Sequence, residues 1–181
     1  MAAAVVEFPV HDSNDRPTDF KEGLPTYLNV TMGDDKKDLE LFLLCTTCTI
    51  SYMFGKPEDF TGIKLVDSSN MVFKSDGEEV KVDFYSAELT VTAVNPEDSS
   101  ETPYKWTQNI GLISPEFQSN TYFDNFKENM LGLAPMLSND TNLLDRQFLY
   151  KFINGDEQKK LGLLESYAFN GGETFAIGGS V

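Results

Sequence analysis

Alternation of hydrophobic and polar positions, rather than helical spacing, dominates this chain. Between Val80 and Phe84 every second residue is apolar, and Lys81 and Asp83 separate them. Because successive side chains of a strand point to opposite faces, this pattern predicts a strand with one buried face. Strands are predicted at residues 4–10, 27–32, 39–44, 48–54, 72–74, 79–85, 87–94 and 173–177, with weaker candidates at 105–114 and 122–126.

Two of these strands are predicted to pair as a hairpin. Tyr27–Met32 and Leu39–Leu44 flank a short charged turn, Gly33–Asp38. A turn of this kind between two apolar runs is typical of antiparallel pairing. The second strand changes from alternating to continuously apolar, as expected where a strand enters the core.

Helical periodicity is confined to the segment Thr141–Phe152. Thr141 or Asn142 is a suitable N-cap, and Leu144, Phe148, Leu149 and Phe152 fall on one face. The chain has no internal repeat and no break in composition. We therefore expect one mostly β domain over residues 1–181 with one or two short helices, in which residues 1–4 are disordered or extraneous.

The net charge of the chain disfavours two classes of binding partner. The 181 residues include 29 acidic and 14 basic side chains, which give a formal net charge of −15. Such a surface repels phosphate backbones and anionic lipids, so neither nucleic acid nor a membrane surface is an expected partner. No apolar run approaches the roughly 20 residues of a membrane span, and the start Met1–Ala4 lacks the features of a secretory signal.

The scarcity of histidine excludes several kinds of site. His11 is the single histidine and lies in a polar stretch, where a solvated surface role is expected. Zinc sites built on several histidines are impossible, and no glycine-rich phosphate-binding motif occurs. The sequence therefore predicts neither a metal nor a cofactor.

The two cysteines form a C-x-x-C motif, Cys45-Thr46-Thr47-Cys48. Such a motif serves redox chemistry when a helix N-terminus follows it, but here the next predicted element is a strand. A local disulfide and a pair of buried thiols remain as alternatives. A metal site would need two more ligands, which neither histidine nor cysteine can supply.

Two segments match the acceptor pattern for N-linked glycosylation. They begin at Asn29 (Asn29-Val30-Thr31) and at Asn139 (Asn139-Asp140-Thr141). Both are candidate modification sites if the chain is secreted.

Five segments occur in the order found in one known family. They are Tyr27–Gly33, Leu41–Ile50, Lys74–Glu79, Glu128–Pro135 and Leu164–Gly179. Together they resemble the N-terminal lobe of the pepsin-like aspartic peptidases, a closed, orthogonal β-barrel-like lobe. The resemblance implies that Cys45–Cys48 occupies the first active-site loop and that Lys74-Ser75-Asp76-Gly77 forms the flap hairpin.

The departures from that family concern catalysis. The family uses two aspartates, one from each lobe, whose like charges about 3 Å apart leave one protonated and one ionised. The first aspartate position holds Cys45, and Thr47 replaces the glycine of the loop. A thiol cannot supply the paired oxygens that hold and activate the water. The second lobe is absent from these residues, and Lys74 stands at the flap tyrosine.

We therefore expect a non-catalytic lobe that binds a protein, a peptide or a glycan. The resemblance further implies a second lobe of the same polypeptide or self-association as a partner, and a secreted, cell-surface or lumenal location. One alternative is an unusual peptidase or thiol oxidoreductase that uses Cys45. Another is a structural protein of a cell surface or wall.

Overall fold

The computed structural model describes residues 4–11, 26–33, 40–72, 79–95, 97–119, 128–135, 137–170 and 174–179. In chain order the strands are β1 (Val5–Pro9), β2 (Tyr27–Met32), β3 (Glu40–Cys45), β4 (Tyr52–Phe54), β5 (Lys64–Val72), β6 (Glu79–Val94), β7 (Glu101–Ile113), β8 (Met130–Gly132), β9 (Tyr167–Asn170) and β10 (Thr174–Gly178). The helices are η1 (Pro57–Asp59), η2 (Pro115–Ser119), α1 (Thr141–Leu144), α2 (Phe148–Ile153) and α3 (Asp156–Leu161).

Six strands close into a barrel. Their order is β2-β3-β8-β4-β7-β6, and the ring closes where Thr31 of β2 pairs with Thr90 of β6. Closure gives every strand of the ring two neighbours, which removes the unpaired edges of an open sheet. β5 pairs with β6 outside the ring. The predicted mostly β class with few short helices is confirmed, as is the β2–β3 hairpin.

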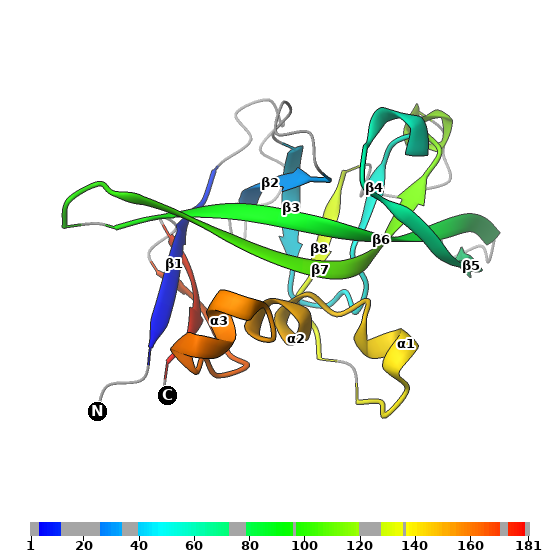
Figure 1. The fold of residues 1–181 in the computed structure, drawn as a ribbon. Coiled ribbons are helices and arrows are strands. Elements are labelled where there is room, and N and C mark those ends of the chain that lie inside the picture. The colour runs from blue at the N-terminus through cyan, green and yellow to red at the C-terminus, as the bar shows by residue number, and fades with distance from the viewer. Residues whose placement is uncertain are drawn as a thin grey trace.

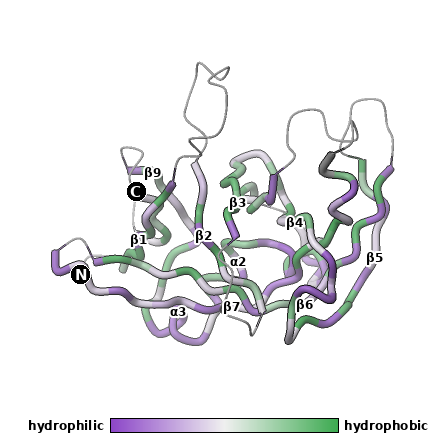
Figure 2. Tube along the Cα trace, turned by 90° about the horizontal axis from the view of Figure 1, so that it is seen from above, coloured by the Kyte–Doolittle hydropathy of each residue, from purple (hydrophilic) through white to green (hydrophobic). Residues whose placement is uncertain are grey.

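A second sheet and a group of helices complete the fold. β1, β10 and β9 form a three-stranded antiparallel sheet. The three α-helices lie together on one side of the long β6–β7 ribbon (Figure 1). Seen from above, β5 lies at one margin of the fold and β1 and β9 lie toward the opposite margin (Figure 2). None of the helices in the described ranges is long and apolar enough to cross a membrane.

The 16-residue strand β6 contributes to two separate cores. Its first half buries even-numbered residues, among them Phe84, in a cluster with Tyr52 and Met130. Its second half buries odd-numbered residues, among them Leu89, in a larger cluster that includes Phe148. The strand therefore changes its buried face halfway along, because different elements cover its two sides.

Several predicted boundaries were wrong. The separate strands predicted at 79–85 and 87–94 are the single strand β6, since the change of buried face is not a break in the backbone. The strand predicted at 48–54 begins only at Tyr52. The helix predicted over 141–152 is two helices, because Gln147 adopts an extended conformation between α1 and α2.

Some elements of the fold were not predicted from the sequence, and one predicted strand lies outside the described residues. The sequence reading missed most of β5, whose residues are almost all exposed and carry no buried stripe. It also missed α3, a single short helix closed by left-handed Gly162. Ala4 is partly buried and packs against the larger core. The strand candidate at 122–126 lies outside the described residues.

The crossing of β8 beneath the Cys45–Ser51 loop requires a glycine. A Cβ atom on Gly132 would lie 2.5 Å from the Ile50 carbonyl oxygen and 2.6 Å from that of Cys48. We expect Gly132→Ala to lower the free energy of unfolding by about 2 kcal/mol, because the backbone of the loop must move. Denaturant titration measures this loss.

Gly55→Ala is the matched control for that measurement. A Cβ at residue 55 would meet only ring atoms of Phe60, at 3.1 Å or more, and Met53 beyond them. A side chain can adjust where a backbone carbonyl cannot, so the loss should stay below about 1 kcal/mol. Equal losses in the two variants would contradict the crossing constraint.

Candidate functional site

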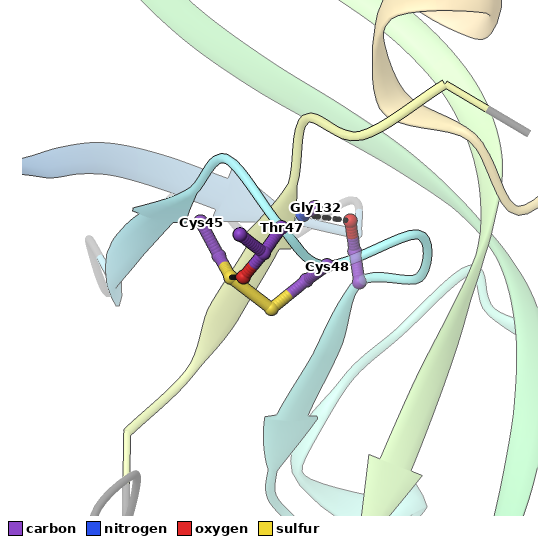
Figure 3. The surroundings of a disulfide bond; sticks show 5 residues. Cys45, Thr47, Cys48 and Gly132 are labelled. Atoms are coloured by element: carbon purple, nitrogen blue, oxygen red, sulfur yellow. Dashed lines mark hydrogen bonds between the residues drawn. A yellow bond between two sulfur atoms is a disulfide. The ribbon is translucent and has the colours of Figure 1, made fainter.

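The candidate site is the loop that joins β3 to β4, residues 45–51. β8 lies between these two strands, parallel to β3 and antiparallel to β4. The backbone N–H of Leu133 donates to the Cys45 carbonyl at 2.9 Å, and that of Ala134 donates to the Cys48 carbonyl at 3.0 Å. The loop is therefore held directly against the chain that leaves β8 (Figure 3).

A disulfide joins Cys45 and Cys48 across the loop (Figure 3). The Thr47 hydroxyl lies 3.6 Å from the Cys45 sulfur and is the donor of that contact, because a bonded sulfur carries no proton. Thr46 and Thr47 are exposed, while both cysteines are partly buried against the smaller core. The tip of the loop thus presents hydroxyl groups to solvent and no carboxylate.

Ser51 anchors the base of the loop, and the sequence reading did not single it out. Its side chain is buried, and its Oγ accepts a hydrogen bond from the Gly132 N–H at 3.0 Å. Its carbonyl accepts from the Gly111 N–H at 3.0 Å. One residue therefore connects the loop to both β8 and β7. The only signal in the sequence was a lone serine between the apolar Ile50 and Tyr52.

A partly buried polar group lies where the chain enters β8. The Tyr27 hydroxyl donates to Glu128 Oε2 at 2.6 Å. The side-chain oxygen of Asn129 accepts from the Phe54 N–H at 3.0 Å. Burial, and secondarily the negative charge of Glu128, raises the pKa of Tyr52 to about 12. Both effects favour the neutral phenol, so Tyr52 keeps its proton at physiological pH.

The chemistry open to this loop is limited. A disulfide-bonded sulfur is neither a thiolate nucleophile nor a general base. Within the described ranges, no three histidine, cysteine or acidic side chains gather as a metal site would require. The arrangement presents hydrogen-bonding hydroxyl groups to solvent on a loop that backbone hydrogen bonds and a disulfide hold in place.

The remaining predicted site residues lie apart from the loop or beyond description. Lys74, Ser75, Asp76 and Gly77 lie outside the described residues. Asn29 is partly buried within β2, and its amide nitrogen lies 2.9 Å from His11 Nε2. Asn139 is exposed in the segment before α1. Of the two acceptor candidates, Asn139 is therefore the more accessible.

Thiol titration checks the disulfide. The native chain should show no reactive thiol, and reduction should release two, because its only two cysteines are bonded to each other. Reduction should cost at most about 2 kcal/mol of stability, since the bond closes a very short loop. One reactive thiol per native chain would contradict this pairing.

Titration of tyrosine absorbance checks the environment of Tyr52. Its pKa is about 12 in the folded chain and about 10 in an unfolded one. Its contribution to stability is therefore fully present below pH 10 and is lost as pH rises through 12, by about 2–3 kcal/mol. Tyr52→Phe should remove that part of the alkaline loss, and an unchanged pH dependence would contradict it.

Comparison with known proteins finds similarity among solved structures. No protein-family model matches the chain, and no curated protein matches it. Among solved structures it is similar to conglutin gamma, a unique basic 7S globulin from lupine seeds, with a TM-score of 0.60 at 7% sequence identity. The match covers 99% of this chain and 50% of the lupine chain. The likeness at this identity concerns the fold alone, and the present chain spans half the length of that neighbour.

Proposed function

We propose that this chain is a non-catalytic lobe of pepsin-like architecture that binds a protein or peptide partner. The observation that carries the proposal is the disulfide between Cys45 and Cys48. It occupies the position at which the resembled peptidases hold their first catalytic aspartate. A bonded sulfur cannot activate water, while the loop around it keeps its shape.

The placement of the resembling segments supports the architectural part of the proposal. The segments Leu41–Ile50 and Glu128–Pro135 are about 80 residues apart in the sequence, yet Cys45 pairs with Gly132 in the barrel. The resemblance places an active-site loop and a strand of Asp-Gly-Ile-Leu-Gly-Leu type at these two positions. Their contact is what a shared site would require.

The chemistry of the loop supports the absence of catalysis. Residues 45–51 contain no acidic side chain, and the thiol needed for a cysteine-based reaction is consumed in the disulfide. Hydrolysis through a water-activating dyad needs a carboxylate and a carboxylic acid close together. Binding needs only the exposed Thr46 and Thr47 and the surface around them.

The same features support the proposed partner and location. The disulfide, the acidic surface and the exposed acceptor Asn139 are in keeping with a secreted, cell-surface or lumenal protein. Exposed apolar side chains lie on the three-stranded sheet and its approach, at Val5, Leu164 and Phe169, and on β5, at Leu65, Val66 and Val72. These apolar side chains are the candidate contacts for a second lobe or a second copy of the chain.

The test pairs a binding measurement with a cleavage measurement. A peptide library is presented to the immobilised chain, and the same library is incubated with the chain in solution from pH 3 to pH 7. We expect saturable binding and no cleavage above the blank, with or without reductant. Cleavage that disappears in Cys45→Ser would overturn the proposal in favour of an enzyme.

Matched variants locate the binding surface. Thr47→Arg places bulk and charge at the exposed tip of the loop and should weaken binding at least tenfold. Thr92→Arg makes the same change on an exposed residue of β6, eight residues, or about 26 Å of extended strand, beyond Phe84, and should leave binding unchanged. Absence of binding to any peptide would instead favour a structural role.

A further inference from the structure

A small polar cleft opens between β5, β7 and the segment from α1 to α2. It has a volume of about 170 Å³ and is lined by Val66, Asp67, Asn109, Asn142 and Arg146. None of these residues belongs to the loop at 45–51. The cleft is therefore a separate feature, and an inference about it does not rest on the proposed function.

The fold holds the charged wall of the cleft rigidly. Arg146 follows α1 and is buried, with its side chain only 9% exposed. Its Nη2 donates to Asp67 Oδ2 at 2.6 Å, and its guanidinium lies 3.8 Å from the centre of the Phe84 ring. A cation held between a carboxylate and an aromatic face has little freedom to move.

Backbone contacts fix the other wall. The Asn109 N–H donates to the Asp145 carbonyl at 2.7 Å, which ties β7 to the residue before Arg146. The Asn142 N–H donates to Asp140 Oδ1 at 2.9 Å, which caps α1. The two asparagine side chains are thus carried on fixed backbone and are available for other contacts.

The cleft has more hydrogen-bonding groups than the protein uses. In the part of the chain that the structure describes, the side-chain amides of Asn109 and Asn142 have no hydrogen-bond partner. Each amide offers both donors and acceptors. Within the same ranges, Asp67 supplies the only side-chain acceptor to Arg146, through Nη2 alone. The ligand that fits must therefore both donate and accept hydrogen bonds.

Charge and size narrow the class of ligand. Asp67 and Arg146 neutralise one another, so neither a free anion nor a free cation gains much in the cleft. The net charge of −15 disfavours anions further. Hydroxyl groups donate and accept equally, as the two amides require. We infer that this cleft binds a neutral polyhydroxylated ring, either a free monosaccharide or the terminal sugar of a glycan.

The experiment follows the side-chain amide signals of Asn109 and Asn142 by nitrogen-15 NMR. The probes are D-glucose, D-galactose, D-mannose and myo-inositol, with sodium sulfate and ethylammonium chloride as charged controls. At least one neutral probe should shift both pairs of amide signals saturably, and the charged controls should not. A trisaccharide ending in the responding sugar separates the sources: tighter binding than the free sugar indicates a glycan.

Two asparagine variants make the test specific. Asn142→Ala removes one amide from an exposed position and leaves the cap by Asp140 intact, and it should weaken binding about tenfold. Asn70→Ala makes the same change on an exposed residue of β5 outside the cleft and should leave affinity unchanged. The inference is overturned if no neutral probe gives saturable shifts, or if Asn142→Ala binds as the native chain does.

If a peptide binds through Thr47 and no sugar binds in the cleft at Asn142, this inference is wrong and the proposed function still stands. Sugar binding at the cleft without any peptide binding would leave the inference standing and count against the proposed function.

Discussion

The close crossing of β8 beneath the Cys45–Ser51 loop is the constraint on which the rest of this structure depends. Gly132 passes within hydrogen-bonding reach of the Ser51 hydroxyl, and a side chain there would meet two backbone carbonyls. The same crossing puts β8 between β3 and β4 and so completes the ring of six strands. Without it, β3 and β4 would each lose a neighbour and the loop would lose its support.

One long ribbon, formed by β6 and β7, connects the barrel with the helices. β6 and β7 pair over twelve residue positions, from Asp83–Leu112 to Val94–Glu101. One half of β6 faces the small core below the disulfide, and the other half faces the larger core packed by α2. The two cores therefore share one continuous pair of strands.

At the candidate site, backbone groups hold the loop in place and side chains determine its chemistry. The loop keeps backbone hydrogen bonds from Leu133 and Ala134 whatever side chains it carries, because carbonyl groups accept them. The chemistry resides in the side chains, and here two sulfurs are bonded to each other. A fold does not by itself fix the function of its site, and the lupine globulin shows that a similar fold occurs at 7% identity.

The sequence by itself determined the local features. Alternation predicted β2 to the residue, and short apolar runs next to charged or glycine-containing turns predicted β3 and β10 to within one residue, although three consecutive residues are buried in each of these two strands. It also marked Cys45 to Cys48 as the chemically distinctive loop, since no other cysteines exist. A feature that depends only on residues nearby in the sequence can be predicted from the local pattern of hydrophobic and polar positions.

Only the tertiary structure decided the features that depend on distant neighbours. The continuity of β6 was hidden because two different cores bury its two halves on opposite faces. Ser51, Gly132 and Arg146 look ordinary in the sequence, and each acquires its role from a partner about 80 residues away. Burial of a side chain, pairing of strands and close approach of two backbones depend on which distant segments pack against a residue. The local sequence pattern does not contain that information.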